Sequence, residues 1–359
     1  TTQVSDLSTT VLNALQTTDV AALTTTEVRA LTTAQISELT TTQVNALETT
    51  DVAALTTTQI DGLTTTQATG LTTTQLGALT TTQVASLTAT QVDALSTTNI
   101  AALSTDQVGA LTTTQVSSLA TTTLNALQTT DVAVLSTTQV RSLTTTQVGA
   151  LTTTQVNALE TTDIAALTTT QVSGITSTQT GALTTTALSG ITSTEVAVLS
   201  TTQINALSTT NAAALSTTQI DGLTATQVSG LSTTTLNALS TTSVASLSST
   251  QAAGITSTQS AALTTTQLGA IETTDLRSLT ATVLNALSTT NVAALSTDQV
   301  DSLTTTQVSG LSTTQLNALQ TTDVAALNTT QVRSLTTAQI SELTTTQVNA
   351  LETTDIAAL

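Results

Sequence analysis

A Leu or Ile occupies every eighth position from Leu7 to Leu359, which gives 44 complete octads and a closing Leu. Numbered 1 to 8 from that residue, the octad reads Leu, Thr or Ser, Thr, Thr, Gln, an aliphatic residue, a small or polar residue, and Ala, Gly or Ser. A continuous α-helix advances ~100° per residue, so eight residues overshoot two turns by about 80° and the Leu positions would spiral around it. The pattern therefore excludes one uninterrupted helix.

The signals that start a helix recur in each octad. Position 2 is a good N-cap residue, as in Thr40, Ser104 and Ser216, and position 5 is mostly Gln, Asp or Glu. This spacing is that of the capping box, and the apolar residues at positions 1 and 6 match the hydrophobic staple. The octad therefore predicts a short helix from position 3 to about position 8, followed by a tight reversal.

The charged residues and the glycines indicate the same polarity. Of the 22 acidic residues, 15 lie at positions 2, 4 or 5, where the helix dipole favours anions. All four Arg lie at position 7, and all 13 Gly lie at positions 7 or 8, where we expect the helix to end and neighbours to approach closely. The prediction is an all-α repeat solenoid of very short capped helices. Because Thr and Val favour strands, a two-sided β-solenoid is the alternative.

Odd and even octads differ in composition. Asn or Asp at position 7 occurs in odd octads, whereas acids at position 2 and nearly all acids at position 5 occur in even ones. We therefore expect a unit of two octads (16 residues), with odd and even segments on opposite flanks of a thin apolar seam. Similar segments recur at fourteen and at twenty-four octads, and fourteen is not divisible by three. A triangular coil of three octads is accordingly disfavoured.

Strict periodicity predicts that residues 1–359 form a single continuous array without separate domains, because repeat proteins grow by adding units. Both ends fall within an octad, which we interpret as a window on a longer repeat protein. The net charge of −18 argues against nucleic-acid binding and against anionic membranes. Apolar runs of four or five residues, such as Ala212 to Leu215, are too short for membrane insertion.

The composition predicts that the chain is not an enzyme and has no catalytic, cofactor-binding or metal-binding residues. It contains no His, Cys, Lys or Tyr, so only a carboxylate could serve a Ser or Thr as general base. Acid pairs such as Glu48 with Asp51 and Glu160 with Asp163 are three apart at predicted helix starts, where capping explains them. The Thr clusters are compatible with capping, glycan attachment or ice binding, and Asn328-Thr329-Thr330 forms one N-glycosylation sequon.

Two resemblances concern the octad as a whole. The stretch Leu-Thr-Thr-Thr-Gln-Val resembles the Leu-Thr-Pro-Glu-Gln-Val opening of the DNA-binding TAL-effector repeat, but the base-reading loop is missing. This resemblance supports the capped helix start, whereas the net charge of −18 argues against carrying over the DNA-binding function. Along the entire chain, Ala-Leu-Thr-Thr-Thr-Gln-Val arrays resemble the Thr-rich octapeptide tandem repeats of very large secreted, adhesin-like bacterial proteins. That resemblance implies export to the cell surface or the extracellular space.

These observations predict a non-enzymatic structural repeat protein. It would form or decorate an extracellular filament, stalk or sheath, and it would self-associate into a fibre or tube through repeated surfaces. The alternative is a binding module whose repetitive Thr-rich surface adheres to glycans or binds ice.

Overall fold

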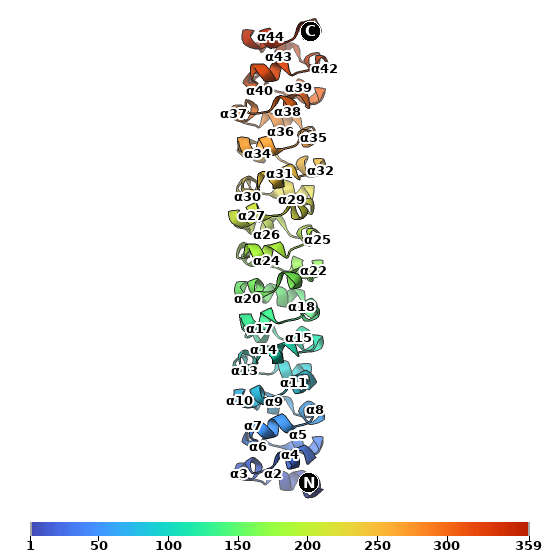
Figure 1. Cartoon of the computed structure of the whole chain (residues 1–359), viewed down its shortest axis with the longest axis vertical. Coiled ribbons are helices and arrows are strands. Elements are labelled where there is room, and N and C mark those ends of the chain that lie inside the picture. Colours follow the sequence, from blue (N-terminus) through green and yellow to red (C-terminus); the bar gives the residue numbers. More distant parts are fainter. Residues whose placement is uncertain (1, 358–359) are drawn as a thin grey trace. The chain divides into compact units, whose positions relative to one another are not determined.

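The computed structural model describes residues 2–357 as a succession of short helices joined by tight connections (Figure 1). Each helix is four to six residues long, and together they number 45 in the described part of the chain. The chain divides into two compact units, Thr1–Ile175 and Thr176–Leu359.

The helices of the first unit are α1 (Thr2–Ser5), α2 (Thr9–Asn13), α3 (Thr17–Ala21), α4 (Thr25–Ala30), α5 (Thr33–Glu38), α6 (Thr41–Ala46), α7 (Thr49–Ala54), α8 (Thr57–Asp61), α9 (Thr65–Gly70), α10 (Thr73–Ala78), α11 (Thr81–Ser86), α12 (Ala89–Asp93), α13 (Thr97–Ala101), α14 (Thr105–Gly109), α15 (Thr113–Ser118), α16 (Thr121–Leu124), α17 (Thr129–Ala133), α18 (Thr137–Ser142), α19 (Thr145–Ala150), α20 (Thr153–Ala158), α21 (Thr161–Ile164) and α22 (Thr169–Ser173).

The helices of the second unit are α23 (Ser177–Gly181), α24 (Thr185–Ser189), α25 (Ser193–Val196), α26 (Thr201–Ala206), α27 (Thr209–Ala214), α28 (Thr217–Asp221), α29 (Ala225–Gly230), α30 (Thr233–Ala238), α31 (Thr241–Ala245), α32 (Ser249–Ala252), α33 (Ser257–Ala262), α34 (Thr265–Ala270), α35 (Thr273–Leu276), α36 (Ala281–Asn285), α37 (Thr289–Val292), α38 (Thr297–Asp301), α39 (Thr305–Gly310), α40 (Thr313–Ala318), α41 (Thr321–Ala325), α42 (Thr329–Val332), α43 (Thr337–Glu342), α44 (Thr345–Ala350) and α45 (Thr353–Ile356).

The predicted all-α class and the capped helix starts are confirmed. Residues 2–357 contain no strand, so the β-solenoid alternative is not supported. In α6, Thr40 is the N-cap residue with extended backbone (φ −65°, ψ 154°), and its hydroxyl accepts a hydrogen bond from the Gln43 amide. The Gln43 side chain in turn accepts the Thr40 amide at 3.0 Å. This reciprocal capping satisfies two amide groups that would otherwise lack partners, and it recurs in most of the helices.

Each helix ends as the chain returns to extended backbone at the next Leu. At the end of α6, Leu47 has φ −64° and ψ 135°, and its amide donates to the Val44 carbonyl. Among the described residues no φ is positive, not even at Gly. Most helices end at positions 7 or 8 as expected, and Gly62 and Gly222 are C-cap residues. Both have right-handed backbone (φ −75° and −72°), so close approach, which was also expected, explains Gly at these positions better than a special backbone conformation does.

Position 8 shows that close approach most clearly. A Cβ added to Gly222, at the end of α28, would lie 2.3 Å from the Ser193 carbonyl oxygen at the start of α25. A Cβ on Gly62 would lie 2.0 Å from the Thr33 Cγ2 atom at the start of α5. In both pairs, the end of one helix contacts the start of the helix three places earlier.

Third-neighbour packing is the rule within each unit. The helix pairs in substantial contact are three apart, for example α12 with α15 and α15 with α18 in the first unit, and α27 with α30 in the second. Side-chain hydrogen bonds reach slightly further, since Gln43 bonds carbonyls 28 and 31 residues earlier. A turn of the solenoid therefore takes between three and four octads.

The predicted arrangement of odd and even octads on opposite flanks is wrong, because neighbours in the solenoid are third helices and not second ones. The sequence argument failed because it allowed only whole numbers of octads per turn. A turn takes between three and four octads, so similar segments need not be separated by a multiple of three octads. The similarity at fourteen octads therefore does not argue against a near-triangular coil. Alternation over 16 residues remains a property of the sequence, and polar contacts described below account for part of it.

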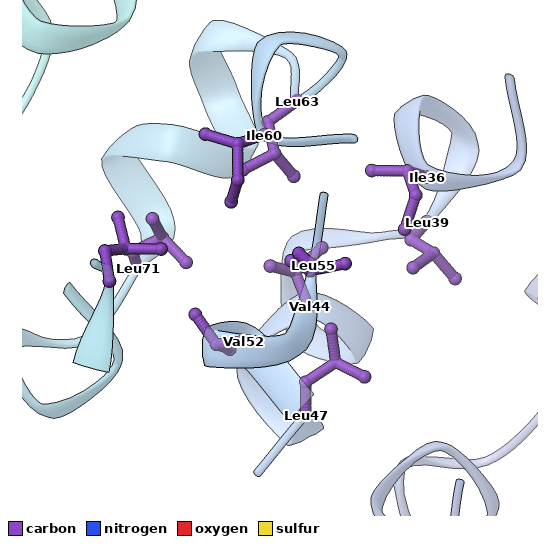
Figure 2. A pocket seen from close by; sticks show the side chains of 10 residues that line it. Ile36, Leu39, Val44, Leu47, Val52, Leu55, Ile60, Leu63 and Leu71 are labelled. Atoms are coloured by element: carbon purple, nitrogen blue, oxygen red, sulfur yellow. The ribbon is translucent and has the colours of Figure 1, made fainter. Parts of the chain in front are cut away.

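The core is a narrow seam formed by positions 1 and 6. In α6 and the following connection, Val44 is 2% exposed and Leu47 is 4% exposed, and the pattern repeats along both units. Figure 2 shows Ile36, Val44 and Leu71, which belong to different octads, pointing into the same space. The cavity among these side chains has a volume of about 10 Å³, and its lining is entirely aliphatic. A dry cavity of that size holds no ligand, so the seam is a packed core.

Candidate functional site

The polar side chain that is most consistently buried in the repeat lies inside the solenoid, at position 5. Gln107 shows it in full: the amide nitrogen Nε2 donates to the carbonyls of Leu76 at 2.9 Å and Leu79 at 2.8 Å. The amide oxygen Oε1 accepts from the backbone amide of Ser104 at 3.0 Å. Gln107 is only 3% exposed. One side chain thus caps its own helix and ties it to the preceding turn of the solenoid.

This interaction explains why the octad prefers Gln over Glu at position 5. Either residue completes a capping box, but only the amide has two hydrogens to donate. The position 6 carbonyl that it reaches already accepts the amide of the next Leu, as the Leu76 carbonyl does from Leu79. The position 1 carbonyl, such as that of Leu79, depends on the Gln amide, and an unpaired buried carbonyl costs about 1–3 kcal/mol. Sequence reasoning assigned position 5 to capping alone and missed the second role. The strong bias towards Gln was the available signal.

Shorter side chains at position 5 make only part of this contact. The Nδ2 atom of Asn99 donates to the Leu71 carbonyl at 2.8 Å, and that of Asn211 donates to the Leu183 carbonyl at 2.7 Å. The Ser243 hydroxyl donates to the Leu215 carbonyl at 3.0 Å. In each case the acceptor is the position 1 carbonyl 28 residues earlier. We call the series of hydrogen bonds from position 5 side chains to these carbonyls the interior ladder.

Acidic residues occupy the same buried slot in several even octads. Asp131 is 3% exposed, and its Oδ2 atom accepts the Gln128 backbone amide at 3.0 Å. Burial raises the pKa of Asp131, and the backbone hydrogen bond lowers that pKa by a smaller amount. The Gln128 side chain donates to the Ala101 carbonyl, 30 residues before Asp131, which is the spacing that Gln83 spans to Ala53 elsewhere. Gln at position 2 thus supplies one of the donors that Asp at position 5 lacks.

The acid pairs singled out in the sequence are divided between surface and interior. Glu48 is exposed, whereas Asp51 is 3% exposed. Burial is the main cause that raises the pKa of Asp51, and the negative charge of Glu48 adds to it. Asp163 is likewise buried, with burial and then Glu160 raising its pKa. The pairs do not converge on a cleft; each Asp occupies the octad position that elsewhere forms the interior ladder.

Asn and Asp at position 7 make a second set of contacts between turns. The Asn205 Nδ2 atom donates to the Gly230 carbonyl at 2.8 Å, and its Oδ1 atom accepts the Ser232 amide at 2.7 Å. Ser232 begins α30, where position 5 is Thr235, a residue that cannot complete a capping box. Asp93 accepts the Ala120 amide in the same manner at the start of α16. The bonds accepted by Asn205 Oδ1 and by Asp93 join octads four apart, which have the same parity, and these contribute to the 16-residue alternation. The bond from Asn205 Nδ2 to Gly230 joins octads three apart, which have opposite parity.

The outer surface is formed by hydroxyl side chains at helix starts. Thr97 and Thr98 lie at the first two positions of α13 and are exposed. They line an open hollow, and a hollow with equivalent residues occurs 192 positions later in the second unit. The first is lined by Thr73, Thr97, Thr98, Ala101, Ala102 and Ala126, and the second by Thr265, Thr289, Thr290, Ala293, Ala294, Ala318 and Gln320.

The structure uses the sequon residue Asn328 as a cap. Its Oδ1 atom accepts the amides of Thr330 and Gln331, both at 3.1 Å, and its Nδ2 atom donates to Asp301 at 3.1 Å. Within residues 2–357 no group of three or more His, Cys, Asp or Glu side chains is placed to hold a metal ion. None of the helices described is both long and apolar enough to cross a membrane.

Comparison with known proteins identifies the family. The ALTTAQ repeat matches eight times, at residues 12–49, 44–81, 73–105, 84–121, 124–161, 156–193, 268–305 and 316–353. These matches cover more than half of the chain, which therefore belongs to the ALTTAQ repeat family. The expectation of a tandem-repeat protein is confirmed at this level. No curated protein matches the chain significantly.

Proposed function

We propose that this chain is a non-enzymatic structural protein whose repeats form or decorate an extracellular filament, stalk or sheath. The proposal rests on the observation that different positions of the octad have different structural roles. Positions 1 and 6 fill the seam and position 5 joins successive turns, while positions 3 and 4 present hydroxyl groups to solvent. A unit built in this way extends by simple addition and repeats the same outer surface along its length.

Self-association follows from that repetition. A contact between two chains at one octad is available again at other octads, so weak contacts add up through many linked sites. Heterologous contacts that do not close produce open polymers. Hydroxyl groups of Thr and exposed carboxylates such as those of Asp61 and Asp221 are the groups available for these contacts. The net charge of −18 opposes close approach of two chains, so association should strengthen as salt screens the repulsion.

Electron microscopy and sedimentation velocity of the full chain test the proposal. We expect fibres, tubes or lateral bundles whose abundance rises between low salt and about 0.5 M salt, where the Debye length falls to roughly 4 Å. A matched variant with Thr98→Lys and Thr290→Lys, which places bulky cations on the Thr surface, should change the association while the helical circular dichroism stays the same. Isolated monomers at every salt concentration would contradict self-association.

A binding module for glycans or ice is the second candidate, and the recurrent hollows favour it. Their linings combine methyl groups of Ala with Thr hydroxyls, which suits the mixed apolar and polar faces of a sugar. Glycan-array binding by the full chain that is lost in Thr98→Ala with Thr290→Ala, but kept in the control Thr42→Ala, would promote this function. Thermal hysteresis in solution would instead indicate ice binding.

A further inference from the structure

Six buried Asp residues occupy an interior slot that in most other octads holds a hydrogen-bond donor. They are Asp51, Asp131, Asp163, Asp275, Asp323 and Asp355, each 3% exposed, and the proposal concerns the first five. Gln, Asn and Ser at the same octad position donate to the Leu carbonyl 28 residues earlier, as Gln107 does to Leu79. An ionised carboxylate has no hydrogen to donate and would place negative charge near a carbonyl oxygen.

Asn99 and Asp131 form an informative pair because their side chains have the same shape. The Asn99 amide donates to the Leu71 carbonyl at 2.8 Å. Asp131 follows Leu103 by the same 28 residues at the same octad position, so we infer that its carboxyl lies near the Leu103 carbonyl as the Asn99 amide lies near Leu71; one of its oxygens accepts the Gln128 amide at 3.0 Å. Protonation of the other oxygen converts Asp131 into the equivalent of Asn99.

We propose that these buried carboxyl groups make the array an acid-strengthened scaffold. When protonated, each carboxyl donates a hydrogen bond to the Leu carbonyl 28 residues earlier and so joins two turns of the solenoid; when ionised, it leaves that carbonyl without a donor. The scaffold therefore tightens as the pH falls and loosens as the pH rises. This inference is independent of whether the protein forms filaments.

The direction of the pH effect follows from proton linkage. Burial is the largest cause that raises the pKa of all five Asp residues above the ordinary 3.8. A carboxyl whose pKa is higher in the folded state binds more protons folded than unfolded, so stability falls as the pH rises through that folded pKa. The contribution is complete below the pKa of the unfolded chain. It is lost over the range that begins near pH 3.8 and extends upward.

Neighbouring charges reinforce this direction at three of the five sites. Glu48, Glu160 and Glu272 stand at the N-cap positions before Asp51, Asp163 and Asp275, and each raises the pKa of its partner. The Ser249 hydroxyl donates to Asp275 at 2.9 Å and lowers the pKa of Asp275, so this site should respond less strongly.

The packed helices carry few other charges. Around Asp131, α14 contributes Asp106 and α20 contributes no titratable group. Around Asp323, α38 contributes Asp298 and Asp301, and α44 none. The α4 helix, which packs against α7, carries Glu27 and Arg29, and α10 carries no charge. The α18 helix, which packs against α21, carries Arg141. Asp275 packs between α32, which has no charge, and α38. Asp131 is thus the site with the fewest competing groups.

Two reciprocal substitutions in the full chain, Asp131→Asn and Asn99→Asp, test the proposal. Hydrogen-exchange protection factors, corrected for the intrinsic pH dependence, would be measured between pH 4.5 and pH 7.5 over α13 to α17. We expect Asp131→Asn to increase protection at pH 7.5 by about threefold to tenfold, the effect of one net hydrogen bond, and to remove the local pH dependence. Asn99→Asp should create a pH dependence at α13. The exposed control Asp61→Asn removes the same charge and should change neither.

Three results would overturn the proposal. One is a loss of protection at neutral pH in Asp131→Asn. Another is a pH dependence around α17 that persists in that variant. The third is a rise in wild-type protection at pH 7.5 on adding CaCl₂ that Asp131→Asn abolishes, because a bound cation would then fill the place assigned to the proton. Retained circular dichroism confirms that each variant is folded.

Discussion

At the scale of single residues, the interior ladder depends on donors more than on shape. Gln219 donates to the carbonyls of Leu188 and Ile191, both at 2.8 Å, while its own oxygen accepts the Ser216 amide at 3.0 Å. The Ser216 hydroxyl also donates to that oxygen at 3.1 Å, so four hydrogen bonds converge on one amide that is 5% exposed. The side chain has no spare capacity, so even an isosteric change has a large effect.

The first prediction concerns that amide. Gln219→Glu keeps the capping acceptor but sets a carboxylate against two carbonyl oxygens, which should destabilise the fold by roughly 2–4 kcal/mol at pH 7. Because the pKa of the new carboxyl would be raised in the folded state, stability should recover as the pH falls. Urea titrations monitored by circular dichroism at pH 4.5 and pH 7 measure both effects. Thr218→Glu adds the same charge at an exposed helix start and should be nearly neutral; an equal loss in both variants would argue against the ladder.

Glycine supplies a second prediction at this scale. Gly222→Ala forces a Cβ to 2.3 Å from the Ser193 carbonyl oxygen, so helices α25 and α28 must separate. We expect destabilisation by about 1–3 kcal/mol, the usual range for overpacking. Gly269→Ala is the matched control: no atom lies within 4 Å of its added Cβ, and it is inside α34. There Ala should stabilise by about 0.5–1 kcal/mol. Thermal melts of the two variants should shift in opposite directions.

At the scale of the helix, each element is too short to be stable alone and depends on its cap and its neighbours. Helices of under ~12 residues are marginal in water, and these contain at most six. The usual cap is local, between positions 2 and 5. Where position 5 cannot supply it, as at α30, a side chain from an earlier turn does so. Capping and packing are thereby joined in one contact.

The third prediction separates these two kinds of cap. Asn205→Ala removes the acceptor for the Ser232 amide and the donor to Gly230, so α30 should open more readily, by about 1–2 kcal/mol. Asn237→Ala is a matched control in the same unit and at the same octad position. The Thr264 amide there is accepted by Gln267, and the Asn237 Oδ1 atom has no partner. Hydrogen exchange should show a larger loss of protection at α30 in Asn205→Ala than at α34 in Asn237→Ala.

The sequence was sufficient for local structure because its signals act within one octad. Thr40 and Gln43 are three residues apart and cap one helix whatever surrounds it. The contact from Gln43 to Leu15 could not be predicted in the same way, because it depends on how far the chain turns at each Leu. A small rotation there decides whether two, three or four octads complete a turn, and φ and ψ near −64° and 135° are common to many extended connections.

The candidate surface was predictable only in part for a related reason. The hydroxyl character of positions 3 and 4 follows from composition, and their exposure follows from the capped helix. The hollow at Thr97 and Thr98 also requires Thr73, which begins α10, and Ala126, which lies in the turn after α16. Such a grouping appears only once the third-neighbour packing is known.

At the scale of the molecule, the number of octads per turn has a consequence that deletions can test. In a two-sided solenoid, removal of one octad would transfer every later octad to the opposite flank, whereas removal of two would restore the pattern. With between three and four octads per turn, the chain has no flanks to exchange, and each octad meets equivalent neighbours within its unit. Deletion of residues 71–78 should therefore be tolerated as well as deletion of residues 63–78.

We expect both deletions to shift the melting temperature by less than about 3 °C, since stability in repeat proteins is a sum over neighbouring units. Deletion of residues 71–74 should be far more damaging, because it places Leu and Gln out of register with every interior position that follows. Thermal unfolding followed by circular dichroism measures all three. A single-octad deletion that destabilises the chain much more than the double deletion would show that the 16-residue alternation is a structural unit after all, and that the polar contacts at position 7 impose a parity that third-neighbour packing alone does not require.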